Sequence, residues 1–433
     1  GNPDGNGGFS FCLPEGEEVA FSCGGDLWVM NMSEKEPVCL HGDTLTLERD
    51  CAFSPDGNDL YFLTDHGDGT DLWVARREDP KKPWTKNKSF KKTRLLADGV
   101  TRQNISLSPD GKRLMWRDGF SRLHFANTNG LDVVDGPNMP ADDVFAWSPD
   151  GKWLACGFAD NHKNYDIWIV STTGARPPCN VSRHFKWDGE PAWSADGKIL
   201  AWAGSRDEGT RIFYFYLDGK GGKGAPNEID FEDIELRIKT INTSRASSLF
   251  FHSSEQKLAF NDGSQTSYVV FPNELSPKRL TAKRGVAQLW GTKKDKGRLL
   301  WSVGNKPAVG DTVYGFSVYQ TTDVADFQEL VFRTCWGRFK NFYYDPNCHG
   351  VDWPAVREKY LWAARNAAAP SVFTRVMLMM LGELDASHLG FWVTDTAKSE
   401  WLPEVFGQNW RPITMHLGLR FDDNYKGPGL RVR

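Results

Sequence analysis

The phrases FSPDG at 53–57, LSPDG at 107–111, WSPDG at 147–151 and WSADG at 193–197 repeat one short pattern along the chain. Ser-Pro-Asp-Gly is turn chemistry, because proline presets φ, aspartate bonds back to the backbone and glycine tolerates positive φ. Weaker copies follow the same pattern, CLPEG at 12–16 and HSSEQ at 252–256. After each copy comes a short apolar run of β character, such as DLYFLT or KILAWAG.

A second apolar strand follows each of these runs at a regular distance. The copies are DLWVMNM at 26–32, DLWVARR at 71–77, RLHFANT at 122–128, DIWIVST at 166–172 and RIFYFYL at 211–217, with steps of 45, 51, 44 and 45 residues. A period in the forties with β signals indicates propeller blades of four strands. The sequence therefore predicts a mainly β fold, a seven-bladed β-propeller over residues 1–321.

Composition excludes several classes of protein. The 433 residues carry 52 Lys and Arg against 56 Asp and Glu, a net charge of −4, which argues against a dedicated nucleic-acid binder. No apolar stretch is long enough for a membrane span. The eight cysteines include no CxxC pair, so we expect free thiols and a reducing compartment. Phosphate-loop, HExxH, GxSxG and calcium-loop patterns are missing as well, so we expect no cofactor and no metal.

The pattern changes near residue 322. VADFQELVFRTCWGRFKNFYY predicts an amphipathic helix with Phe327, Leu330, Val331, Cys335 and Phe339 near one face. After the loop DPNCHGVD, two more helices are predicted, WPAVREKYLWAARNA with Asp352 as N-cap and SVFTRVMLMMLGELDA leading into SHLGFW. Strand-like runs, TMHLGLRFD and GPGLRVR, follow a polar stretch. The sequence thus predicts a C-terminal α segment over 322–404 and a further β unit over 405–433.

Two of these segments carry a specific resemblance. YYDPNCHGVDWPAVREKY and LGELDASHLGFW resemble the first core domain of tricorn-type serine peptidases, which are related to the C-terminal processing peptidases. HLGLRFDDNYKGPGLRV resembles the opening of the PDZ domain that follows in that family. The resemblance implies peptide substrates, a homo-oligomer and a cytoplasmic location, with a periplasmic or secreted location left open. The chain begins at Gly1 without methionine, so we expect a fragment whose PDZ domain is incomplete.

The resemblance implies a catalytic pair at Ser387 and His388. His388 is expected to be the general base that activates a serine nucleophile, and Ser387 to orient its ring. In the family the nucleophilic serine and an assisting glutamate lie beyond the PDZ domain, so we expect this fragment alone to be inactive. Without the flanking match, a Ser-His dipeptide is an ordinary surface pair.

Three weaker candidates have simpler structural explanations. His349 could approach a site, but a place in the loop before the Asp352 cap is the preferred interpretation. Glu383 is expected to serve as a helix-surface or capping residue. The resemblance implies that cationic side chains can anchor a substrate's C-terminal carboxylate, a role open to the basic run at 78–94, but we expect a solvated insertion between two strands of blade two.

Two other functions compete with peptide hydrolysis. A TolB-like propeller could be a non-catalytic binding module for protein partners, and a later core segment without its serine would favour this. A sugar- or metal-dependent propeller enzyme would need clustered carboxylates or histidines at the central channel. The aspartates of the repeated phrase are better explained as turn residues, which counts against that third function.

Overall fold

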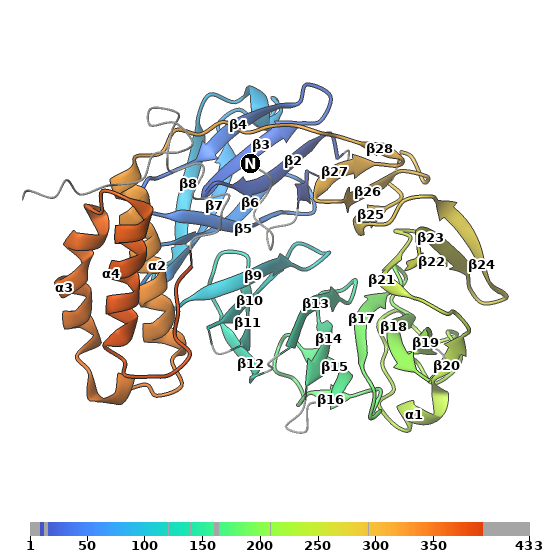
Figure 1. Cartoon of the computed structure of the whole chain (residues 1–433). Coiled ribbons are helices and arrows are strands. Elements are labelled where there is room, and N and C mark those ends of the chain that lie inside the picture. The colour runs from blue at the N-terminus through green and yellow to red at the C-terminus, as the bar shows by residue number, and fades with distance from the viewer. Residues whose placement is uncertain are drawn as a thin grey trace, which may run out of the picture. The chain divides into compact units, whose positions relative to one another are not determined.

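The computed structural model describes residues 9–12, 16–119, 121–138, 141–159, 164–207, 209–292 and 294–392. Seven four-stranded antiparallel sheets follow one another along the chain, and each is built from four consecutive strands (Figure 1). The first strand of every sheet contributes side chains to one shared cavity of about 810 Å³. The fold is therefore mainly β, a seven-bladed propeller whose innermost strands surround a central channel, followed by helices.

The strands of each blade are consecutive in number. Blades one to three contain β1 (Ser10–Phe11), β2 (Glu18–Cys23), β3 (Asp26–Asn31), β4 (Glu36–His41); β5 (Leu47–Phe53), β6 (Asp59–Asp65), β7 (Thr70–Arg77), β8 (Phe90–Leu96); β9 (Arg102–Leu107), β10 (Arg113–Asp118), β11 (Arg122–Asn127) and β12 (Val134–Asn138). Blades four to seven contain β13 (Ala141–Trp147), β14 (Trp153–Ala159), β15 (Tyr165–Ser171), β16 (Cys179–Asn180); β17 (Asp188–Trp193), β18 (Ile199–Arg206), β19 (Gly209–Tyr216), β20 (Lys239–Ile241); β21 (Ser247–Phe251), β22 (Lys257–Asp262), β23 (Gln265–Val270), β24 (Glu274–Thr281); β25 (Val286–Trp290), β26 (Leu299–Val303), β27 (Lys306–Val309) and β28 (Thr312–Val313).

The helices are fewer and lie mostly after the propeller. They are η1 (Trp84–Lys86), α1 (Ile234–Arg237), α2 (Val324–Phe342), η2 (Cys348–Gly350), α3 (Trp353–Arg365) and α4 (Pro370–Gly382). The chain divides into two compact units, residues 1–366 and 367–433, so α4 belongs to the second unit. The predicted PDZ opening at 405–433 lies outside the described residues.

The repeated Ser-Pro-Asp-Gly phrase makes the turn between the first and second strand of a blade. In the copy at 53–57, the Ser54 hydroxyl donates to the Asp56 carboxylate at 2.6 Å and accepts the Asp59 backbone N–H at 2.9 Å. The copies around Ser108, Ser148 and Ser194 repeat the same bonds. The turn prolines line the central cavity. In each copy the serine hydroxyl accepts a backbone N–H that no strand partner satisfies in the turn, and the aspartate carboxylate holds that hydroxyl in place.

Among the described residues, the first and last blades of the ring exchange no strand. Gln288 in β25 accepts the backbone N–H of Phe11 in β1 at 2.8 Å, and Leu300 of blade seven packs into the apolar cluster of blade one. The extended segment after β28 covers the same seam, since Tyr314, Phe316 and Val318 alternate against that cluster (Figure 1, the orange segment passing β3 and β4). Side chains rather than a shared strand therefore hold the first and last blades together.

Asp26 connects blade one to this covering segment. Its carboxylate accepts a hydrogen bond from the Gln320 side chain at 2.6 Å. Burial, followed by the nearby Glu48 carboxylate, raises the pKa of Asp26 to about 6. Folding therefore favours the protonated form of Asp26. The stability that this protonation adds to the folded protein is lost as the pH rises through about 6.

We expect Asp26→Asn to stabilise the protein near pH 8 and to have no effect near pH 4. At the higher pH the wild-type chain must keep a carboxylate charged beside Glu48, whereas asparagine still accepts the Gln320 bond. Because Asp26 is only half-buried, the gain should stay under about 1 kcal/mol. Thermal unfolding midpoints of both proteins at both pH values measure it. A variant less stable than wild type near pH 8 would contradict this account.

Candidate functional site

Helices α2 and α3 are joined by a reciprocal tryptophan pair. The Trp336 indole N–H of α2 donates to the Trp353 carbonyl at 2.8 Å, and the Trp353 indole N–H of α3 donates to the Trp336 carbonyl at 3.0 Å. Arg365 at the end of α3 also reaches Glu329 and Asp326 of α2, at 2.5 and 2.7 Å. The Asp352 carboxylate caps α3 by accepting the Ala355 N–H, as the sequence predicts. The two helices therefore form one rigid hairpin.

This hairpin rests on the loops of blades two and three. The helix backbone at Gly337 meets the backbone of Gly67 in the β6–β7 loop so closely that a Cβ on Gly337 would overlap the Gly67 carbonyl. Asn341 donates to the Thr101 hydroxyl at 2.7 Å, and Arg357 lies 3.7 Å from Asp68. Glycine is therefore required at 337 because nothing larger than hydrogen fits between helix and loop.

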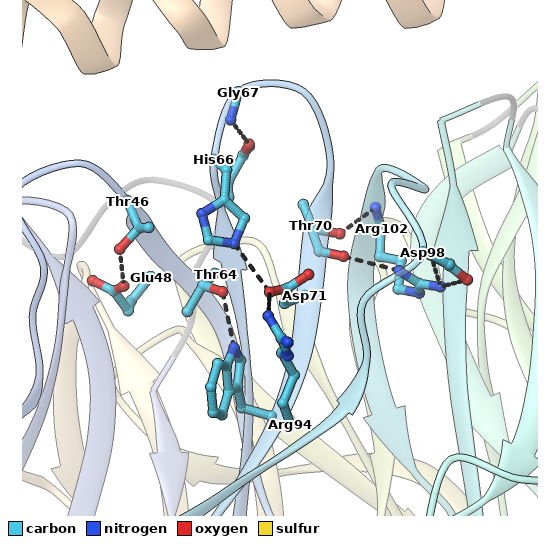
Figure 2. A network of polar contacts seen from close by, with 12 residues as sticks. Thr46, Glu48, Thr64, His66, Gly67, Thr70, Asp71, Arg94, Asp98 and Arg102 are labelled. Carbon is cyan, nitrogen blue, oxygen red and sulfur yellow. Dashed lines mark hydrogen bonds and ion pairs between the residues drawn. The ribbon is translucent and has the colours of Figure 1, made fainter.

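Polar contacts hold the β6–β7 loop from below (Figure 2). The Asp65 carboxylate accepts the Gly67 N–H at 2.8 Å, and His66 and Arg94 both contact the Asp71 carboxylate, at 3.1 and 3.3 Å. At the start of β9, buried Arg102 bonds to the Thr70 carbonyl and to Asp98 of the preceding loop. Contacts within the propeller therefore hold the β6–β7 loop in place without any contribution from α2.

We expect Gly337→Ala to lower the free energy of unfolding by about 1–3 kcal/mol, because the added methyl group must displace helix or loop. Gly382→Ala is the matched control. It also changes a helical glycine, but open space surrounds that position, so it should be neutral or stabilising by up to about 1 kcal/mol. Denaturant unfolding of the three proteins measures both effects. Equal stability of the two variants would show that α2 does not contact the loop in solution.

The predicted pair Ser387 and His388 follows α4. This helix begins at Pro370 and ends at Gly382, and buried Leu384 and exposed Asp385 lead to the pair. Phe391 packs edge-on against Phe373 of α4, with ring centroids 5.7 Å apart, and so turns the segment back towards its own helix. The pair therefore lies on a short connection held at both ends by the second compact unit.

Both side chains of this pair are exposed. The backbone at His388 is left-handed, with a φ of 63°, which is unusual for a residue other than glycine and is often found at functional positions. Neither Ser387 nor His388 has a hydrogen-bond or ion-pair partner among the residues that the structure describes. Nor does that part of the chain bring three metal-ligating side chains together. The arrangement offers a neighbouring hydroxyl and imidazole that are open to a further group.

His349 and Glu383 lie elsewhere. His349 sits in η2 between α2 and α3, also with a left-handed φ of 55°, where its backbone N–H donates to Asp345 and its ring contacts the Tyr344 hydroxyl. Glu383 is the C-terminal capping residue of α4.

The sequence did not predict the lining of the central cavity, where the aromatic side chains are Phe9, Phe53, Phe145, Trp147, Trp193 and Phe251. Their only sequence signal is the aromatic residue before several turn phrases.

The helical segment after the propeller matches a known protein family. Residues 325–382 match the family model described as the tricorn protease C1 domain. The chain is tricorn-like. A solved structure of the tricorn protease superposes on 88% of this chain with a TM-score of 0.68 and 13% identity, which shows the shared fold. The tricorn-like chain spans 41% of the length of that protease.

Other similar solved structures have lower TM-scores. The putative TolB from Agrobacterium tumefaciens matches 51% of the tricorn-like chain over 75% of its own length, with 18% identity and a TM-score of 0.37. An oligogalacturonate lyase in complex with manganese matches 70% over 88% of its length, with 11% identity and a TM-score of 0.46. Neither likeness carries an argument about function. No curated protein matches the sequence. Among the described residues, no helix is long and apolar enough to cross a membrane.

Proposed function

We propose that the full-length protein is a serine-type peptidase of the tricorn kind that cleaves short, unfolded peptides. The observation that carries this proposal is the match of residues 325–382 to the C1 domain, followed five residues later by the exposed Ser387–His388 pair. A cytoplasmic location and a homo-oligomeric assembly belong to the same proposal and rest on the same likeness.

His388 is the general base in this proposal. One ring nitrogen takes the proton of a serine hydroxyl as that oxygen attacks the peptide carbonyl, and the proton then passes to the leaving amine. Water hydrolyses the resulting ester and regenerates the serine. Ser387 is a positioning residue that fixes the orientation of the imidazole ring. The nucleophilic serine and an assisting glutamate come from a second core segment beyond residue 433.

The propeller acts in this proposal as a filter for substrates. Its cavity of about 810 Å³ has the size of sites that hold small molecules, so it admits a few residues of an extended peptide and no folded domain. Aromatic side chains and turn prolines line it, and such surfaces contact peptides of many sequences. A filter of this kind selects for an unfolded chain more than for particular side chains.

The test is peptide cleavage by the full-length protein together with covalent trapping of its serine. We expect cleavage of short fluorogenic peptides, no cleavage of a folded protein, and loss of activity when a fluorophosphonate labels a single serine beyond residue 433. Labelling without peptide cleavage would point to another acyl-transfer reaction. Neither labelling nor cleavage by the folded full-length protein would overturn the proposal and favour the non-catalytic binding module.

A further inference from the structure

The outermost strand of a propeller blade has one edge without a strand partner, and such an edge can pair with another chain. In this propeller six of the seven outer strands avoid such pairing. β4, β12 and β24 each contain a proline, at Pro37, Pro137 and Pro277, and β16, β20 and β28 are only two or three residues long. Both devices block strand addition, because proline removes a donor and a short strand offers too few bonds.

β8 is the exception. It runs for seven residues, FKKTRLL, without proline or glycine, and it pairs only with β7. Residues 91–94 are exposed. Among the described residues, no main-chain group of β8 takes part in a hydrogen bond outside that ladder. The open edge of β8 therefore has the length and the free donors and acceptors that a strand partner needs.

The charged residues of β8 and of the segment that leads into it all have the same sign. Between Pro80 and Leu96 the sequence has seven Lys and Arg and no Asp or Glu, in a chain of net charge −4. Lys82, Lys86 and Arg94 pair with acidic residues elsewhere. Four further lysines form no ion pair with any described residue: Lys81, Lys88, Lys91 and Lys92. In many sheets, lysines on an edge strand simply repel other strands. Cations without an ion-pair partner along an open edge also favour an acidic strand over a neutral or basic one.

The segment that leads into β8 is held rigidly, so the surface exists before a partner arrives. Trp84 and Thr85 donate their backbone N–H groups to the buried Glu18 carboxylate of blade one, at 2.8 and 2.9 Å. The Asn87 side chain donates to the carbonyls of Asp79, Lys82 and Pro83. A surface ordered in advance loses little conformational entropy on binding.

We propose that the β8 edge binds an extended, acidic segment of a partner protein by strand addition. Acidic side chains on one face of the added strand would meet Lys91, and those on the other face Lys92, because neighbouring residues of a strand point to opposite faces. The edge lies on the outer rim of blade two, whereas β5 of the same sheet lines the channel. The site is therefore separate from the proposed path of substrate peptides.

The probe is a fluorescein-labelled peptide of about six alternating Glu and Thr residues, the length of an average strand. We expect fluorescence anisotropy to show binding to the chain and at least about tenfold weaker binding to the Lys91→Glu, Lys92→Glu double variant. The control is Lys278→Glu with Arg279→Glu, two adjacent cations on the proline-containing strand β24, which should change affinity less than about twofold. Equal weakening by both pairs would overturn the proposal, because it would show only general charge attraction.

Two further measurements separate strand addition from other modes. A peptide methylated at alternate backbone nitrogens cannot donate to β8 and should bind at least about tenfold more weakly. Hydrogen exchange should slow on peptide binding in residues 90–96 and not in the strands that line the cavity. Unchanged binding of the methylated peptide, or protection confined to the cavity, would overturn the proposal. Tighter binding of a duplex oligonucleotide, lost in the β8 variant, would identify the edge as a nucleic-acid site instead.

Discussion

His388→Asn in the full-length protein is expected to lower kcat/KM for short peptides by about 10²- to 10⁴-fold, the usual contribution of a general base. Asparagine is the suitable replacement because it tolerates the left-handed backbone that His388 adopts, with its φ of 63°. The variant therefore removes the imidazole without straining the turn after α4. Steady-state cleavage of fluorogenic peptides measures the loss.

The chain provides a matched control in His349→Asn. His349 is also exposed and left-handed, with a φ of 55°, but it lies between α2 and α3. We expect this variant to keep kcat/KM within about twofold of wild type, because the ring packs against Tyr343 and Tyr344 in the loop between α2 and α3, away from the Ser387–His388 pair in sequence. Loss of cleavage in His349→Asn with full activity in His388→Asn would transfer the general base to the other histidine.

Trp84→Ala is expected to lower the free energy of unfolding by about 3–5 kcal/mol, the cost of truncating a fully buried aromatic side chain. The Trp84 side chain has no exposed surface, its indole N–H donates to the Gly57 carbonyl at 3.0 Å, and its ring stacks on Phe90. Its backbone N–H bonds to Glu18 of blade one. Truncation would therefore leave a cavity between the first two blades. Denaturant titration measures the change.

Trp362→Ala is the control for this prediction, because it removes a tryptophan side chain that is not buried. The Trp362 side chain of α3 is 76% exposed, so its removal should change the unfolding free energy by no more than about 0.5 kcal/mol. If the two variants were equally stable, Trp84 would not join the blades in solution, and the basic stretch around it would be a solvated insertion after all.

The repeated turn phrase and the strands that recur beside it were sufficient to predict the propeller, because both are local signals. Proline, aspartate and glycine set the turn within five residues, and the alternating strands beside it need no distant partner to be recognised. The predicted solvated insertion at 78–94 was wrong in part. Trp84 is buried and residues 90–96 form β8. Nothing in the local sequence shows that Glu18, more than sixty residues earlier, accepts from its backbone.

The face of α2 shows a similar limit. Helical periodicity favoured a face containing Phe327, Leu330, Val331, Cys335 and Phe339. Of these Leu330 is buried, but the other buried positions of the helix are Gln328, Glu329, Phe332, Trp336 and Gly337. Glu329 is buried because arginines of α2 and α3 pair with it, and Gly337 because it meets a loop of blade two. Apolar periodicity cannot detect ion pairs or backbone contacts.

The Ser387–His388 pair was chosen from a family pattern, and no periodicity or composition singles it out. Its assignment as base and positioning residue stays a prediction, since its proposed partners lie outside the described residues. The left-handed backbone at His388 does not single it out either, because exposed His349 shares that conformation. A motif can name these residues, but the chemistry depends on groups that only the full-length protein brings to them.

Closing the ring with side chains has a consequence for the synthesis of this protein. Each sheet is complete once its own strands have been made, but Phe11 meets Gln288 only after 277 further residues. At ordinary rates of translation this delay is on the order of tens of seconds. Throughout it, the flank of blade one that later packs on Leu300 and Phe316 has no cover. The ribosome-bound chain therefore exposes an apolar surface on blade one until blade seven emerges, so we expect a chaperone to bind blade one during synthesis.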